Sequence, residues 1–114
     1  INRAPIEQGI LNYCYEQGIG FIAFSPLAQG LLTDRYLNGI PSDSRMAKNF
    51  FLKESALTPE LLAKLNEWHT EAAAQGMKLA EHSLRWVLQQ QGVTSLIVGA
   101  SSVAQLETNI RAML

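Results

Sequence analysis

Two short segments of the chain carry residues whose types and spacing fit the binding of phosphate groups. The first, 24–30, reads FSPLAQG, and the second, 98–102, reads VGASS. Gly99 allows close approach of a ligand to the backbone, and Ser101 and Ser102 stand where the free amides of a following helix would meet an anion. The alternative interpretation, which fits either segment taken alone, is that these are ordinary turn and cap residues.

Both segments follow short runs that are typical of strands, and the first run is apolar on both faces, as in a buried parallel strand. Residues 21–24 (FIAF) lie between Gly20 and Ser25-Pro26, and residues 94–98 (TSLIV) lead into the second segment. A run that is apolar on both faces predicts a strand buried on both sides, and a proline ends it because it cannot donate to the ladder. Ligands of parallel α/β folds bind beyond the carboxyl ends of the strands. The two segments are therefore predicted to form one phosphate-binding rim.

Helical patterns surround the two strands. They are predicted over 4–17, from Thr58 to a stop at Gly76, over about 79–91, and from 103 onward. Thr58 supplies a cap, Pro59 a preset first-turn φ and Glu60 an acid near the positive end of the helix dipole. In the last helix we expect the apolar residues to face inward, and these are Val103, Leu106, Ile110 and Met113.

The order helix, strand, loop, helix, helix, strand, helix indicates a parallel α/β architecture. Residues 33–57 keep no sustained period and are interpreted as a long loop, a kind that is usually functional or disordered. Two strands do not make an independent parallel sheet, so neighbouring strands outside this sequence are expected. The chain starts without Met and stops inside a helical pattern. We therefore expect residues 1–114 to be one partial domain, cut at both ends.

Composition argues against several classes of function. The 114 residues are 47% hydrophobic and 17% charged, with a net charge of −1 and no basic cluster for nucleic acid or a membrane surface. No apolar run approaches the roughly 20 residues that span a bilayer. The single Cys14 excludes an internal disulfide and fits a cytoplasmic location. His69 and His82 lack further ligands at metal-binding spacing, which favours packing or surface roles and predicts no metal site.

Taken together, the two segments and the loop between them resemble the aldo-keto reductase family. Residues 18–36 (GIGFIAFSPLAQGLLTDRY), 39–41 and 44–45 resemble its seventh-strand region, and 98–101 with Gln105, Leu106 and Asn109 resemble its eighth-strand cofactor motif. The likeness covers essentially the whole chain and is nearest to the branch of potassium-channel β-subunits and bacterial glyceraldehyde-3-phosphate-type reductases. It implies the C-terminal part of a (β/α)8 TIM barrel: helix 6, strand 7, the helix 7 region, strand 8 and helix 8.

The resemblance also implies that NADP(H) lies extended across the barrel mouth. The residues implied around the pyrophosphate are Ser25, Pro26, Leu27, Ala28 and Gln29. Phe24 would lie near the nicotinamide. Arg35 stands where relatives carry a basic residue, often Lys, that reaches a cofactor phosphate, and Arg45 matches a second basic position. Without the resemblance, both arginines could equally be solvated loop charges.

The second segment would hold the adenosine end of the cofactor. Gly99, Ser101 and Gln105 would contact the adenosine phosphate, and Asn109 the adenine edge. Relatives usually carry Glu directly before this Asn, whereas here Thr108 takes that place. The alternative for Gln105 is a capping role, since it has the capping-box spacing from Ser102, and for Asn109 an exposed polar position.

The resemblance places no catalytic residue in this chain. Family reductases use a Tyr acid assisted by Lys, Asp and His from the first half of the barrel, and Tyr13, Tyr15 and Tyr36 match none of these positions. A hydride donor still needs a positioned acid, so the chain alone is expected to be inert. Its expected partners are a small carbonyl substrate, the remainder of the barrel and a second copy in a homo-oligomer. The alternatives are a regulatory NADP(H)-binding subunit of the channel type and a non-functional fragment.

Overall fold

The computed structural model describes residues 1–44, 46–47 and 54–114. The helices and strands are α1 (Ala4–Glu7), α2 (Ile10–Glu16), β1 (Phe21–Phe24), α3 (Pro59–Ala74), α4 (Leu79–Leu88), β2 (Val93–Ile97) and α5 (Val103–Arg111). Single 3₁₀ turns are η1 (Ala28–Gly30), η2 (Asp34–Tyr36) and η3 (Glu54–Ala56). This order confirms the α/β class, and both strands lie within one residue of their predicted bounds.

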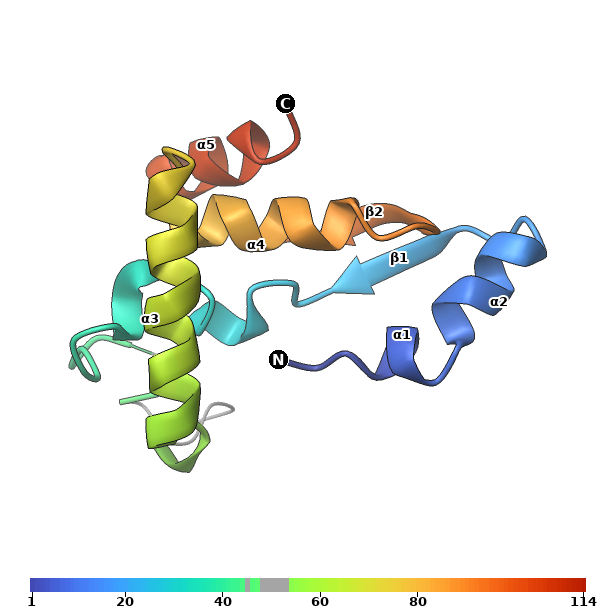
Figure 1. The fold of residues 1–114 in the computed structure, drawn as a ribbon. Coiled ribbons are helices and arrows are strands. Elements are labelled where there is room, and N and C mark those ends of the chain that lie inside the picture. The colour runs from blue at the N-terminus through green and yellow to red at the C-terminus, as the bar shows by residue number, and fades with distance from the viewer. Residues whose placement is uncertain (45, 48–53) are drawn as a thin grey trace.

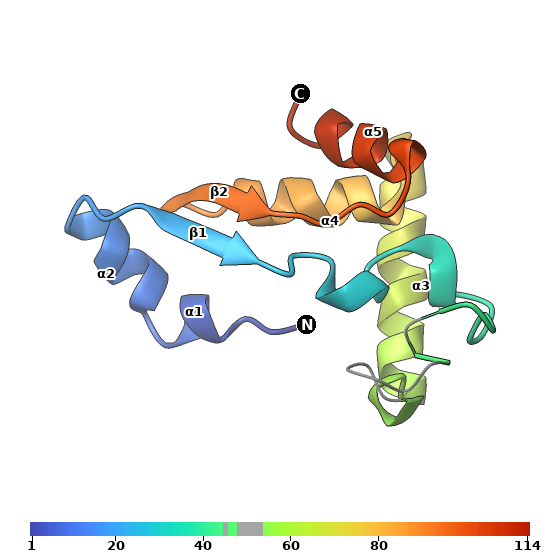
Figure 2. The same ribbon diagram turned by 180° about the vertical axis from the view of Figure 1, so that it is seen from behind.

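β1 and β2 pair in parallel, and this pairing brings the two predicted segments together. Ala23 is the register partner of Leu96 and Phe24 that of Ile97. Because the strands run in the same direction, their carboxyl ends open at one edge of the sheet. The connections to η1 and to α5 both leave from this edge (Figures 1 and 2). The second segment therefore begins beside the first.

The prediction that β1 is buried on both faces is wrong for this structure. Phe24 is 78% exposed, Ile97 61% and Ile22 59%. The register places these three side chains on one face of the sheet, and α4 contacts β2 while α2 contacts β1. No described element buries the face that holds Phe24, so the apolar run that predicted two buried faces has only one partner layer here.

The helix predicted over 4–17 is broken into α1 and α2. Gly9 lies between them with a φ of 80°, in the left-handed region that ends a helix. The repeat of Ile6, Ile10 and Cys14 continues across this break and so concealed it. The predicted stop at Gly18 is confirmed, since α2 ends just before it.

α3 forms as the sequence predicted, and it supports the loop that follows β1. Thr58 Oγ1 accepts a hydrogen bond from the Leu61 amide at 3.1 Å, which caps the helix. Leu65 and Ala72 on its apolar face are fully buried. α3 stands across one end of α4 (Figure 1). A small core packs beside this helix, built from 28–31, from the start of α3 and from the described part of 33–57, which was predicted as an irregular loop. Its members are Leu31, Tyr36 and Met46, with Ala28, Ala56, Leu57 and Leu61 against them.

α5 packs with a different face from the one predicted. Four residues were expected to face inward but are exposed: Val103 by 74%, Leu106 by 48%, Ile110 by 46% and Met113 by 50%. Asn109 and Ala112 are buried instead, at 3% and 5% exposed. α5 contacts α4, so neighbouring positions, about 100° around the helix, form its inner face.

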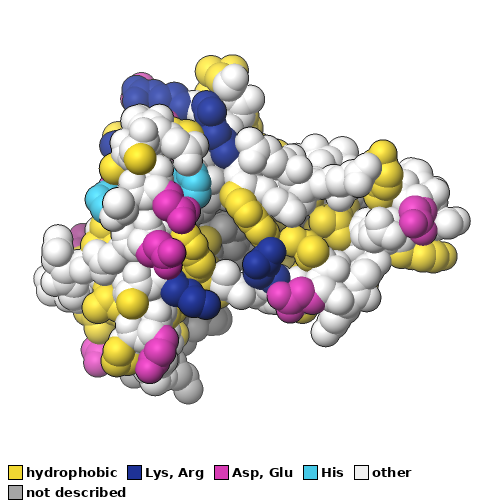
Figure 3. Space-filling model, viewed as in Figure 1, with side chains coloured by type: hydrophobic (Ala, Val, Ile, Leu, Met, Phe, Trp, Pro, Cys, Tyr) yellow, Lys and Arg dark blue, Asp and Glu magenta, His cyan; other side chains and the backbone are white. Residues whose placement is uncertain are grey.

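Charged side chains gather over α3, and hydrophobic ones reach the surface at the α2 end of the molecule (Figure 3). Among the helices described, none has the length and apolar character that a membrane span requires.

Candidate functional site

The loop that follows β1 is tight, and its backbone is strained at three positions. Three non-glycine residues have a left-handed φ, at 49° for Ser25, 48° for Ala28 and 59° for Gln29. Such a conformation costs about 1–2 kcal/mol for an ordinary residue, and it concentrates at functional sites. The Ala28 amide donates to the Ser25 carbonyl at 2.9 Å, and the Leu32 amide to the Leu27 carbonyl at 3.1 Å. The predicted pyrophosphate residues thus form one compact turn, at the edge where Phe24 ends β1.

Arg35 lies in η2, on the connection that continues from this turn. Thr33 Oγ1 donates to the Gly30 carbonyl at 2.6 Å and accepts from the Arg35 amide at 3.3 Å, so the start of η2 is capped. Arg35 Nη2 forms an ion pair with Asp43 Oδ2 at 2.8 Å, and the two side chains are 38% and 77% exposed. A phosphate reaching this guanidinium would compete with a carboxylate already bound to it. Arg45, the second predicted basic residue, lies outside the described residues.

η2 is also joined to α3. His69 Nδ1 lies 3.1 Å from Asp34 Oδ1, with side chains 41% and 46% exposed. A carboxylate only accepts, so Nδ1 carries the hydrogen in this contact. Within the described ranges no three His, Cys, Asp or Glu side chains gather as metal ligands.

The second segment caps α5, and Gln105 of that helix in turn holds the segment. Ser102 Oγ accepts from the Gln105 amide at 3.2 Å. Gln105 Oε1 accepts from both the Ser101 amide, at 2.8 Å, and Ser101 Oγ, at 2.9 Å. The predicted capping box is therefore altered, because Gln105 reaches the residue before the cap. The amides of Ser102, Val103 and Ala104 head the helix, where no intrahelical carbonyl is available to them.

Asn109 lies beneath this segment. Its Nδ2 donates to the Gly99 carbonyl at 3.4 Å, and the residue is 3% exposed, so it is not the exposed polar position weighed as an alternative. A Cβ placed on Gly99 would meet nothing within 4 Å, so space is open in front of its backbone. Thr108 Oγ1 donates to the Ala104 carbonyl at 3.0 Å, so its hydroxyl donates within its own helix.

These residues suit an anionic, phosphate-bearing ligand. They offer backbone amides at a helix start, open space at Gly99 and a guanidinium on the neighbouring connection. Two of the contacts are not predicted from the sequence: Asp43 on Arg35, and His69 on Asp34. Asp43 lies within the recognised loop and could have been weighed as an opposite charge, whereas 35 residues separate Asp34 from His69 and no local pattern joins them.

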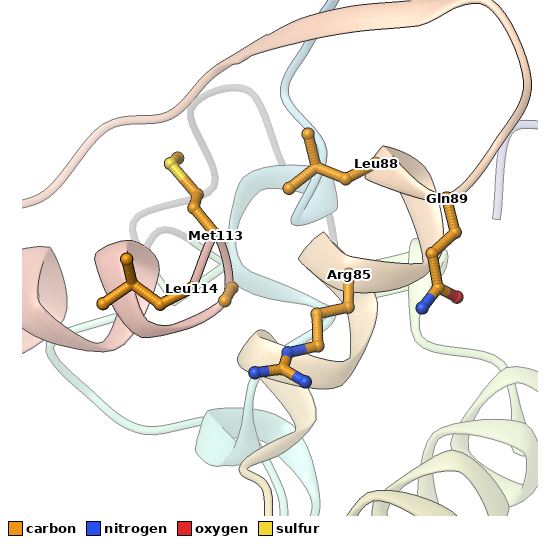
Figure 4. A pocket seen from close by; sticks show the side chains of 6 residues that line it. Arg85, Leu88, Gln89, Met113 and Leu114 are labelled. Atoms are coloured by element: carbon orange, nitrogen blue, oxygen red, sulfur yellow. The ribbon is translucent and has the colours of Figure 1, made fainter.

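A separate hollow of about 220 Å³ lies between α4 and the segment after α5, lined by Arg85, Leu88, Gln89, Ala112, Met113 and Leu114 (Figure 4). Arg85 Nη2 donates to the Arg111 carbonyl at 3.4 Å across it. This hollow is at the C-terminal end of α5, whereas Ser101 and Gln105 are at its N-terminal end. It is not part of the candidate site.

Known proteins align with the chain over nearly all of its length. A model of the aldo/keto reductase family matches residues 3–114. The L-glyceraldehyde 3-phosphate reductase of Escherichia coli O157:H7 is 47% identical over 118 residues, covering 99% of this chain and 34% of that protein. The probable voltage-gated potassium channel subunit beta of Arabidopsis thaliana is 34% identical over 114 residues, covering 97% of this chain and 35% of that protein. The chain spans about a third of the length of these relatives. It belongs to the aldo/keto reductase family.

Proposed function

We propose that this chain supplies part of the NADP(H) site of a reductase that converts aldehydes or ketones to alcohols. The observation that carries the proposal is the pairing of Phe24 with Ile97. It sets two loops with anion-binding features side by side at the carboxyl edge of a parallel sheet, the edge at which α/β folds bind nucleotides.

The described residues fit the phosphate groups of such a cofactor. The turn at Ser25–Gln29 would hold the pyrophosphate, and Arg35 would reach a phosphate from η2. Gly99, Ser101 and Gln105 would hold the adenosine phosphate at the start of α5, and Phe24 would lie toward the nicotinamide. Asn109 would meet the adenine edge and, through its contact with Gly99, hold the loop from behind. When bound, NADPH supplies the hydride that reduces a carbonyl carbon. The chain's own contribution is to bind and orient it.

The proposal places this chain in the seventh- and eighth-strand part of a (β/α)8 barrel. The uncovered sheet face at Ile22, Phe24 and Ile97 is a surface that further strands and barrel interior would bury. The proton donor would come from outside these residues. Tyr36 is 1% exposed within the loop core, and Tyr13 and Tyr15 lie on α2, which precedes β1 rather than following it.

Cofactor titration of the intact protein that contains this chain tests the proposal. Replacing Arg35 by Ala should weaken NADPH binding about tenfold, the range of one hydrogen bond to a charged group. Arg111→Ala is the matched control, because Arg111 is an exposed arginine in the last turn of α5. Absence of any NADPH binding by the unchanged protein would overturn the proposal. Equal affinity of the Arg35 variant and the unchanged protein would remove Arg35 from the site.

A regulatory NADP(H)-binding subunit is the second candidate, and the likeness to two plant proteins named as probable channel β-subunits favours it, at 34% and 33% identity. Turnover of NADPH with small aldehydes separates the two candidates. Steady consumption with alcohol formed in equal amount supports the reductase, whereas tight NADPH binding without turnover supports regulation.

A further inference from the structure

Arg35 is held between two anchored neighbours. On one side, Asp34 Oδ1 lies 3.1 Å from His69 Nδ1 on α3. On the other, Tyr36 is 1% exposed in the core formed with Leu31 and Met46. A 3₁₀ turn of three residues has little freedom once both of its flanks are fixed. The direction in which the Arg35 side chain leaves the backbone is therefore set by contacts that its neighbours make.

His69 is a firm anchor because of its place on α3. Leu65 lies four residues before it and Ala72 three residues after it, and both are fully buried. Residues at these spacings share one face of a helix, so the backbone at His69 is fixed against the core on both sides. The helix itself is capped at Thr58 and 16 residues long. The contact between His69 and Asp34 thus fixes η2 relative to α3.

We infer that His69 is a positioning residue for cofactor binding, acting through Asp34 to hold Arg35 where it meets a phosphate of NADP(H). The inference rests on the proposed function, because it gives His69 a role only through Arg35. The Asp43 ion pair at 2.8 Å occupies the tip of the same side chain, where a phosphate would displace the carboxylate. The backbone and the tip of Arg35 are thus held by different groups, and the contact with α3 is one of those that hold the backbone.

The link lies apart from the buried core, which makes its role separable from stability. The side chains of His69 and Asp34 are 41% and 46% exposed, whereas Leu31, Tyr36 and Met46 are buried. An exposed contact of this kind contributes little to folding. Loss of the imidazole should therefore leave the thermal midpoint nearly unchanged while the affinity for NADPH falls.

The test is NADPH titration of the intact protein with five variants, Arg35→Ala among them, each also examined by thermal unfolding. His69→Ala should weaken binding about threefold to fivefold, the effect expected when an exposed contact that orders a ligand group is lost. His69→Asn should restore most of the affinity, because its Nδ2 can donate from near the place of Nδ1. His82→Ala, on α4, is the control and should bind NADPH as the unchanged protein does. His69→Ala combined with Arg35→Ala should bind no more weakly than Arg35→Ala alone.

Three outcomes would overturn the inference: unchanged affinity in His69→Ala, no recovery in His69→Asn, or a further loss from His69→Ala in the Arg35→Ala background. If Arg35→Ala weakens binding and His69→Ala does not, only the positioning role fails. If Arg35→Ala is itself without effect, the assignment of Arg35 to the cofactor fails, and the role of His69 fails with it. If the unchanged protein binds no NADPH, the proposed function fails.

Discussion

Asn109 Nδ2 donates to the carbonyl oxygen of Gly99 at 3.4 Å, from a side chain that is almost wholly buried. The contact joins the last turn of α5 to the loop after β2. Gln105 holds Ser101 of the same loop from one turn earlier. α5 therefore does more than follow the second segment, because two of its amide side chains set the shape of the loop that precedes it.

The first prediction concerns the donor on Asn109. Asn109→Asp keeps the size of the side chain but replaces the donor by a buried carboxylate facing a carbonyl oxygen. We expect the free energy of unfolding to fall by about 2 kcal/mol or more at neutral pH, since an unpartnered buried charge is costly. Urea denaturation of the intact protein measures it, and Thr108→Ala, one residue away, is the control with a loss below about 1 kcal/mol. Equal losses in the two variants would show that Asn109 does not hold Gly99.

The second prediction separates the two roles of Gln105. Gln105→Glu keeps an oxygen that accepts from Ser101 and adds a negative charge at the start of α5. The charge favours the helix dipole by about 0.3–1 kcal/mol, so stability should hold or rise slightly. The same charge repels a phosphate, so NADPH binding should weaken about tenfold, a loss of about 1.4 kcal/mol.

Gln105→Ala is the companion measurement. It removes the acceptor for Ser101 without adding charge, so both stability and affinity should fall. Thermal unfolding and NADPH titration on the two variants give the comparison. Unchanged affinity in Gln105→Glu would mean that no phosphate lies at this end of α5 and that Gln105 only shapes the loop.

The third prediction uses the ion pair on Arg35. Asp43 competes with an incoming phosphate for the guanidinium, so Asp43→Asn should tighten NADPH binding about twofold to fivefold, the range of an exposed ion pair. The gain should shrink as salt is raised, because both side chains are partly exposed. Isothermal titration at two ionic strengths measures it. Weaker binding in Asp43→Asn would instead mean that the carboxylate orients Arg35 toward its ligand.

Local signals in the sequence are enough to place the elements whose ends are marked by glycine, proline or a capping residue. β1 was predicted at its observed bounds because Gly20 and Pro26 frame a short apolar run, and α3 because Thr58 and Pro59 start it. Both signals act within a few residues, so no knowledge of tertiary contacts was needed. The alignment of both strand ends at one edge followed from the parallel pairing that the element order implied.

The failures have a common physical origin. The spacing of Val103, Leu106 and Ile110 shows which residues share a stripe on α5, but the layer that the stripe meets depends on the rest of the fold. Here α4 takes the side that holds Asn109. The contact between Asp34 and His69 likewise depends on where α3 lies, and no short-range pattern encodes that.

The fourth prediction concerns the left-handed backbone at Gln29, where φ is 59° and ψ is 26°. Glycine adopts this region without a Cβ penalty, so Gln29→Gly should raise the free energy of unfolding by about 0.5–1 kcal/mol. Gln89 offers a matched control, since it ends α4 with a right-handed φ of −78°. There the same replacement should lower stability by up to about 1 kcal/mol, because glycine only adds freedom to the unfolded chain. Opposite signs in urea denaturation would locate strain in the turn after β1. The same sign at both positions would show that the turn holds Gln29 without strain, and the case for a site there would then depend on NADPH binding alone.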